Sequence, residues 1–196
     1  MKVIIMAAGQ SSRFGSNKQF IKIGDETLIR RLCRQVIERE GTPIIVTQNK
    51  NLKRHCKNFE IYQPKYYDTQ LHSMLFSSSL WENEDKVILL WGDTIFTDDF
   101  CDKIFNEMNF KVLLSENKSE TLGMVVPSQY YEILRKQIKI ILSKNPEDVA
   151  LAFTLYSKLK EEIENIELIA DFISRDIDTQ KELTIFHNEV ILEDKI

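Results

Sequence analysis

One stretch near the N-terminus decides the expected fold. An apolar run, Val3-Ile4-Ile5-Met6-Ala7-Ala8, passes directly into the polar stretch Gly9-Gln10-Ser11-Ser12-Arg13-Phe14-Gly15-Ser16-Asn17-Lys18. The apolar run is typical of a strand buried on both faces, and it is too short for a membrane span or for the apolar part of a signal peptide. The polar stretch offers small residues, whose backbone N–H groups can converge on phosphate oxygens, and two cations, Arg13 and Lys18. On these residues alone, a triphosphate-binding loop and a solvated strand–helix connection remain equally open.

Outward from this stretch, strand and helix patterns alternate through the first half of the chain. The sequence predicts strands at Val3–Ala8, Pro43–Thr47, Phe59–Tyr62 and Val87–Trp91, and helices at about Thr27–Glu40 and from an N-cap at Thr69 to about Leu80. The order strand-helix-strand-strand-helix-strand predicts the α/β class. We expect a doubly wound, mostly parallel sheet with helices on both faces.

The second half of the chain is richer in helical patterns. Helices are expected around Phe100–Met108, at Tyr130–Ser143, at Pro146–Asn165 and near Gln180–Phe186; strands are expected at Val112–Leu114 and Met124–Val126, and Ile166–Ile173 is a further apolar stretch. No repeat, low-complexity tract or linker interrupts the chain. We therefore expect one domain over residues 1–196, with room for a small helical subdomain near residues 128–165.

Composition and charge exclude several classes of protein. Hydrophobic residues make up 43% and charged residues 29% of the 196 residues, which excludes disordered and fibrous proteins. The formal net charge of -4 gives no general attraction to nucleic acid or to an anionic membrane, so we expect neither as a partner. The three cysteines (Cys33, Cys56 and Cys101) are widely spaced and indicate neither a disulfide framework nor a zinc site. We expect reduced thiols in a cytoplasmic protein.

The segment from Ile4 to Gly15, followed by Lys18, resembles the signature loop of the GT-A-like nucleotidyltransferases. This superfamily includes sugar-phosphate nucleotidyltransferases, molybdenum-cofactor guanylyl- and cytidylyltransferases, and methylerythritol-phosphate cytidylyltransferases. Residues 10–15 are most similar to the molybdenum-cofactor (MobA-like) branch, and residues 18–20 are also similar to the methylerythritol-phosphate branch. The resemblance implies that the loop wraps the phosphates of a nucleoside triphosphate (NTP). The residues that it implies for NTP binding are Ala7, Ala8, Gly9, Gln10, Ser11, Ser12, Arg13, Lys18 and Ser73.

Two of these residues are expected to be catalytic. By the resemblance, Arg13 stabilises the departing pyrophosphate, and Lys18 contacts the phosphates at the reacting centre. Ser73 lies roughly where some members of the superfamily have a serine that faces the nucleobase. A core or capping role for Ser73 and for His72 remains the alternative.

Asp93 follows the expected strand Val87–Trp91 directly, after Gly92. Ligands bind at the carboxyl ends of the strands in open α/β sheets, and Mg²⁺ prefers one or two carboxylates together with substrate phosphates. An Asp after Gly is also a common turn or capping residue. The superfamily has a metal-binding Asp after an apolar run and a Gly at this place, so the resemblance implies Mg²⁺ on Asp93. The residues after it, Thr94-Ile95-Phe96, differ from the usual ones.

A second metal ligand is implied by the segment from Asp176 to Leu183, which resembles the superfamily's C-terminal Asp-Thr-Pro-Glu-Asp-Leu element. The resemblance implies Asp178 as the ligand, with Asp176 as the alternative or as its neighbour. Gln180 and Lys181 replace the usual Pro and Glu. Capping of the final helix by Asp178 also remains open.

The resemblance implies transfer of NMP from an NTP, with CTP slightly preferred, to a phosphorylated small molecule with release of pyrophosphate. A sugar phosphate, an alditol phosphate, phosphocholine or a cofactor phosphate could be the acceptor. An acceptor phosphate is already ionised near pH 7, so positioning and charge neutralisation can suffice for catalysis. Two other classes stay open: a GT-A glycosyltransferase that uses a nucleotide-sugar, against which Arg13 and Lys18 argue, and a nucleotide-binding regulatory module without turnover.

Overall fold

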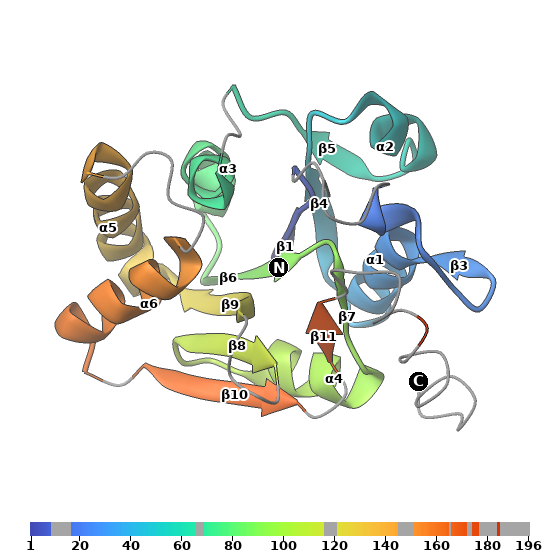
Figure 1. Cartoon of the computed structure of the whole chain (residues 1–196). Coiled ribbons are helices and arrows are strands. Elements are labelled where there is room, and N and C mark those ends of the chain that lie inside the picture. Colours follow the sequence, from blue (N-terminus) through green and yellow to red (C-terminus); the bar gives the residue numbers. More distant parts are fainter. Residues whose placement is uncertain are drawn as a thin grey trace.

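A seven-stranded sheet forms the centre of the molecule (Figure 1). The computed structural model describes residues 1–8, 17–65, 69–115, 121–144, 151–164, 166–171, 174–176 and 184. The strands of the sheet are, in spatial order, β10 (Glu167–Asp171), β8 (Lys111–Ser115), β9 (Thr121–Pro127), β6 (Lys86–Trp91), β1 (Lys2–Met6), β4 (Thr42–Val46) and β5 (Glu60–Tyr62). Strand β9 runs antiparallel to both of its neighbours, whereas the remaining pairs are parallel. The prediction of a mostly parallel sheet is confirmed.

Helices cover both faces of this sheet (Figure 1). One face carries α1 (Leu28–Glu38), α2 (Lys50–His55) and α4 (Asp98–Asn106), and the other carries α3 (Gln70–Ser77), α5 (Tyr131–Lys144) and α6 (Leu151–Glu162). Alternate residues of β1 supply the two hydrophobic clusters: Val3 and Ile5 face the first set of helices, and Ile4 and Met6 face the second. The doubly wound arrangement is therefore confirmed.

The apolar run at the N-terminus forms the middle of the sheet. Val3, Ile4 and Ile5 have no exposed surface, and β1 lies between β6 and β4. Burying one such side chain contributes about 1.5–3 kcal/mol to the free energy of folding. Side chains of α5 and α6 belong to the same hydrophobic cluster as Ile4, so these two helices pack directly on the sheet. None of the helices within the described residues is long and apolar enough to cross a membrane.

Several boundaries differ from those expected. Helix α4 ends at Asn106, and Met108 lies beyond it with 66% of its surface exposed. The prediction that Met108 belongs to the apolar face of this helix is therefore wrong. The apolar stretch Ile166–Ile173 contains the edge strand β10. Within the described residues α6 starts at Leu151; the first residues of the helix expected at Pro146–Asn165 lie outside them. The helix expected near Gln180–Phe186 also lies outside them, apart from Thr184.

Some short elements have no counterpart in the sequence prediction. These are α2, the hairpin of β2 (Lys22–Ile23) with β3 (Glu26–Thr27), the ribbon of β7 (Thr94–Ile95) with β11 (Arg175–Asp176), and the 3-10 turns η1 (Lys18–Phe20) and η3 (Ser128–Tyr130). A further 3-10 turn, η2 (Ser78–Trp81), forms the end of the helix expected from Thr69 to about Leu80. Elements of two to six residues are too short to show a helical or strand period. Helix α2 nevertheless has a local signal, because the Asn49 side chain accepts hydrogen bonds from the backbone of Asn51 and Leu52.

Candidate active site

The carboxyl ends of β1 and β6 meet at one edge of the sheet. Met6 pairs with Trp91, and the Gly92 N–H donates a 2.9 Å hydrogen bond to the Met6 carbonyl. A Cβ atom on Gly92 would lie 3.0 Å from the Cβ of Ala7. The missing side chain at position 92 therefore lets the two strand ends approach closely. As a result, the chain leaves β1 and β6 at adjacent points, at Ala8 and at Asp93.

Lys18 returns to this edge from the other side of the polar stretch. Its Nζ lies 3.5 Å from Oδ2 of Asp93, although the two residues are 75 positions apart. The Lys18 side chain is 5% exposed and that of Asp93 is 30% exposed. A buried ammonium group needs anionic partners, and the Asp93 carboxylate supplies one. The partial exposure of Asp93 leaves its carboxylate within reach of a ligand.

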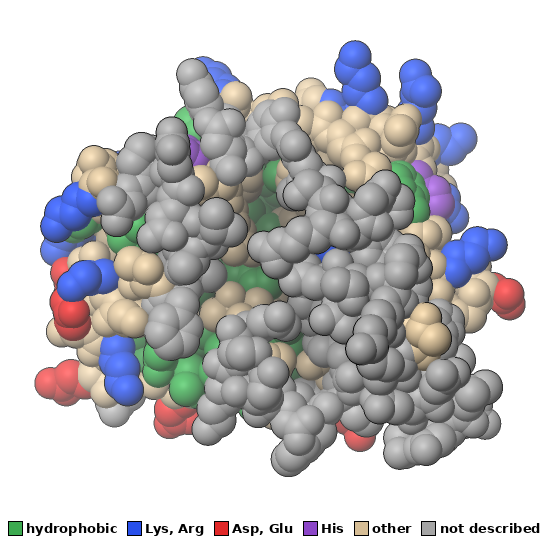
Figure 2. Space-filling view, viewed as in Figure 1, with side chains coloured by type: hydrophobic (Ala, Val, Ile, Leu, Met, Phe, Trp, Pro, Cys, Tyr) green, Lys and Arg blue, Asp and Glu red, His purple; other side chains and the backbone are tan. Residues whose placement is uncertain are grey.

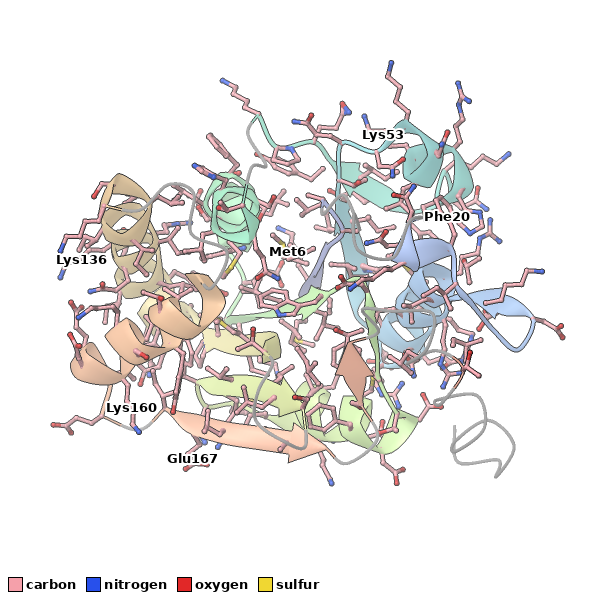
Figure 3. The ribbon with its side chains drawn as sticks, in the orientation of Figure 1. Met6, Phe20, Lys53, Lys136, Lys160 and Glu167 are labelled. Carbon is pink, nitrogen blue, oxygen red and sulfur yellow. The ribbon has the colours of Figure 1, made fainter. Side chains whose placement is uncertain are left out.

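A hollow opens at the centre of the face seen in Figure 2, with hydrophobic side chains on its floor. Figure 3 places Met6, at the end of β1, in the same central region. Trp91, which pairs with Met6, is 5% exposed, and its Nε1–H donates to Oγ1 of Thr121 at 3.3 Å. Trp91 ends the expected strand Val87–Trp91, and its place next to Gly92 and Asp93 adds an aromatic side chain to the edge that carries the site.

Ser73 lies on α3, whose N-terminus is capped by Thr69 as predicted. The Thr69 hydroxyl oxygen accepts from the backbone N–H of His72 and lies 3.0 Å from Nδ1 of the same residue. The Ser73 side chain is buried, and its Oγ has no hydrogen-bond partner within the described part of the chain. Because protein atoms cover this oxygen, an NTP could reach Ser73 only after its neighbours move.

The C-terminal part of the chain returns to the residue after Asp93. Strand β11 pairs antiparallel with β7, so that Asp176 lies opposite Thr94 (Figure 1). The buried Ser174 hydroxyl oxygen fixes this approach, because it accepts a 3.1 Å hydrogen bond from the backbone N–H of Thr97. The backbone of Asp176 is thus next to the segment that follows Asp93. No alternation of apolar and polar residues in the sequence predicts this pairing.

The structure brings together part of the predicted site. Ala7, Ala8, Lys18 and Asp93 lie at one edge of the sheet, and Ser73 lies on α3. The expected residues Gly9, Gln10, Ser11, Ser12, Arg13 and Asp178 lie outside the described residues. Within the described ranges, no group of three or more His, Cys, Asp or Glu side chains could hold a metal ion. Asp93 alone nevertheless fits Mg²⁺, which takes one or two carboxylates and completes its shell with substrate phosphates and water.

The three cysteines offer no reactive thiolate to this site. Cys33, Cys56 and Cys101 are buried free thiols. Burial raises the pKa of Cys56 to about 11 and that of Cys101 to about 12, and it raises the pKa of Cys33 further. All three therefore stay protonated at neutral pH, which removes the thiolate form that acts as a nucleophile.

Because Gly92 lies so close to Ala7, a side chain at position 92 should destabilise the protein. Gly92→Ala should lower the free energy of unfolding by about 1–3 kcal/mol, because the new methyl group would press on Ala7 and on the Met6 carbonyl. The double variant Ala7→Gly/Gly92→Ala removes the methyl group that the new one meets, so it should recover part of this loss. Urea unfolding of the two single variants and the double variant measures the coupling. Strictly additive losses would show that the two positions do not touch.

The chain matches the model of the MobA-like NTP transferase domain over residues 3–152, which is 150 of its 196 residues. No curated protein matches it. Among solved structures it is similar to the CTP:phosphocholine cytidylyltransferase from Streptococcus pneumoniae (12% identity, TM-score 0.69, covering 97% of this chain and 98% of that one) and to the inositol-1-phosphate CTP transferase from T. maritima (14%, 0.68, 99% and 95%).

The bifunctional IspDF from Campylobacter jejuni shares the fold over 94% of this chain and 53% of that one, with 16% identity and a TM-score of 0.68. At these identities the solved structures show the fold alone. The family model covers most of the chain, including β1 from its second residue, Lys18 and Asp93. The chain belongs to the MobA-like NTP transferase family.

Proposed function

We propose that the protein transfers NMP from an NTP, with CTP slightly preferred, to a phosphorylated small-molecule acceptor and releases pyrophosphate. One observation carries the proposal: the Lys18 ammonium group lies 3.5 Å from the Asp93 carboxylate at the edge where β1 and β6 end. In the sequence, Lys18 follows the loop segment that resembles the family. Membership of the family supports the reaction class. The names of two structural neighbours, which contain CTP, support the choice of nucleotide.

The proposed reaction needs no covalent intermediate on the protein. An oxygen of the acceptor phosphate attacks the α-phosphorus, the bond from that phosphorus to its bridging oxygen breaks, and pyrophosphate leaves with the electron pair. The acceptor oxygen is already negatively charged near pH 7, so no protein base has to remove a proton. The protonated cysteines fit this scheme, because it needs no thiolate nucleophile.

Lys18 then acts at the reacting centre. Its ammonium group is almost fully buried, so its attraction to phosphate oxygens is screened less than that of a surface lysine. We assign it the neutralisation of charge at the α-phosphate. Arg13 would hold the β- and γ-phosphates with its forked guanidinium group, together with the backbone of residues 9–12.

Asp93 would hold Mg²⁺, with Asp178 as the second carboxylate and Asp176 as the alternative. The pairing of Asp176 with Thr94 supports this assignment, because it brings the C-terminal segment next to the Asp93 segment. When bound, Mg²⁺ neutralises phosphate charge. In its absence, Lys18 and Asp93 neutralise each other, so both side chains can stay ionised in a largely buried site before the substrate binds.

The acceptor would occupy the central hollow in Figure 2. Its floor is hydrophobic, and Trp91 and Met6 lie at the adjoining strand ends. This character favours an acceptor that carries hydrocarbon surface beside its phosphate. Phosphocholine, named for the neighbour from Streptococcus pneumoniae, is therefore the first acceptor to test. Inositol 1-phosphate, named for the neighbour from T. maritima, is a polyol and serves as the polar comparison.

Nucleotide binding provides the first test. In a thermal-shift panel, CTP with Mg²⁺ should stabilise the protein, by about 2.7 kcal/mol when the nucleotide is a hundredfold above its dissociation constant. The panel includes ATP, GTP, UTP, UDP-glucose and CDP-choline, each with Mg²⁺ and with EDTA. EDTA should remove most of the shift. A shift with the nucleotide-sugar and with none of the NTPs would favour a glycosyltransferase.

Substitution of the carboxylates provides the second test. Asp93→Asn and Asp178→Asn should each lower turnover by about two to three orders of magnitude, because an amide cannot neutralise Mg²⁺. Asp93→Asn should also lower the melting temperature, because it removes the counter-charge that Asp93 gives the buried Lys18 ammonium group, so turnover is measured well below the melting temperature of each variant. Asp99→Asn, on the exposed first turn of α4, is the matched control and should keep normal turnover. Normal turnover of both site variants would contradict the two-carboxylate metal site.

A further inference from the structure

We propose that Phe20 and His55 are positioning residues that hold Lys18 over Asp93. The proposal deepens the proposed function, on which its kinetic part rests. Neither residue belongs to the expected NTP-binding set, and neither contacts Lys18 or Asp93 through any hydrogen bond or ion pair described above. Their effect on the site would pass through the backbone of the turn η1, which carries Lys18 at its first position and Phe20 at its last.

The turn η1 has little internal stability. It is one 3-10 turn, closed by the hydrogen bonds from Phe20 N–H to the Asn17 carbonyl and from Ile21 N–H to the Lys18 carbonyl. The Asn17 side chain makes no capping hydrogen bond. Three-residue turns of this kind have poorer hydrogen-bond geometry than α-helices and depend on their surroundings. The position of the buried Lys18 ammonium group therefore depends largely on the tertiary contacts made by the residues at the two ends of the turn.

Phe20 anchors the C-terminal end of this turn. Figure 3 shows it where α1 and α2 come together. Its ring meets the imidazole of His55 edge-on, with centroids 5.2 Å apart and an interplanar angle of 78°. Such aromatic pairs contribute about 0.5–1.5 kcal/mol beyond the area that they bury. Phe20 also packs against the hydrophobic cluster of α1, α2 and α4.

His55 is itself fixed from α1 by two hydrogen bonds. Its Nε2 lies 2.8 Å from the Thr27 hydroxyl oxygen, and its backbone carbonyl accepts a 2.9 Å hydrogen bond from the Arg30 guanidinium group. Thr27 occupies the N-cap position of α1, yet its side chain makes no capping hydrogen bond and contacts His55 instead. Burial and the charge of Arg30 lower the pKa of His55, so its ring is neutral at neutral pH.

These contacts form one connected path from α2 to the site. The end of α2 presents His55, His55 contacts the ring of Phe20, and Phe20 closes the turn whose first residue lies 3.5 Å from Asp93. A backbone hydrogen bond of 2.7 Å, from Leu28 N–H to the Ile21 carbonyl, holds the chain after the turn against the start of α1. Loss of either ring would leave the C-terminal end of the turn without its lateral support, while the Lys18 side chain itself would be unchanged.

The direct test measures how well Lys18 is shielded, without any substrate. Acetylation of the native protein with an amine-reactive ester, followed by mass spectrometry, gives the modification rate of each lysine. In Phe20→Ala and in His55→Ala, Lys18 should react about tenfold faster than in the wild type, because the turn opens more often. His55→Phe keeps an aromatic ring beside Phe20 and should restore slow labelling.

Phe59→Ala is the matched control. Phe59 packs against the same hydrophobic cluster and is also a partly buried aromatic residue. Its loss should lower stability in a similar way and leave Lys18 labelling at the wild-type rate. Equal labelling of Lys18 in Phe59→Ala, Phe20→Ala and His55→Ala would overturn the proposal, since it would reduce Phe20 and His55 to general packing. If Phe20→Ala fails to fold, His55→Ala and His55→Phe decide the same question.

A double-mutant cycle then asks whether Phe20 acts through Lys18. Phe20→Ala should lower kcat by about tenfold with little change in KM for the NTP, because it displaces a group that acts on the transition state. In a Lys18→Met background the same change should have almost no further effect. Additive losses would contradict the proposal. Normal turnover of Lys18→Met would instead contradict the role given to Lys18 in the proposed function, while the labelling result would still stand.

Discussion

The approach of two parallel strand ends is the constraint on which the rest of the site depends. Gly92 passes the end of β1 so closely that a side chain at this position would touch Ala7. Because of this contact, the chain leaves both strands at one point, and the Asp93 carboxylate faces the place to which Lys18 returns. The two hydrophobic clusters on either side hold the strands in this register. The core of the protein and its charged centre are therefore built by the same pair of strands.

Charge at this centre is local. The chain as a whole carries a formal charge of -4, so a phosphate ligand gains no attraction from the overall field. Under the proposed function, the Lys18 ammonium group would supply this attraction once Mg²⁺ occupies the Asp93 carboxylate with which it is otherwise paired. The pair also contributes to the burial of this lysine, because a nearby opposite charge offsets part of the cost of removing its hydration. The position of this lysine depends on the turn that carries it, for which we have proposed support from the rings of Phe20 and His55.

The sequence predicts the sheet and its two helical layers because long apolar runs and helical periods identify β1, β6, α1 and α5 directly. It also predicts Lys18 and Asp93 as site residues, through the resemblance of the loop and of the run before Gly92, and the structure brings these two side chains within 3.5 Å. It does not predict the β7–β11 ribbon, because two-residue strands have no period and their pairing is decided by tertiary contacts. For the same reason the contact between Phe20 and His55 is absent from the prediction: it joins two short elements whose separation in space no local pattern encodes.

Product formation is the decisive measurement for nucleotidyl transfer at this site. In ³¹P NMR of the protein with CTP, Mg²⁺ and phosphocholine or inositol 1-phosphate, we expect a new diphosphate diester signal that grows in step with pyrophosphate, one for one. The control omits the acceptor and should give neither product. Hydrolysis of CTP to CMP and pyrophosphate with no diester, or transfer of sugar from a nucleotide-sugar under the same conditions, would contradict the assignment of this site to nucleotidyl transfer.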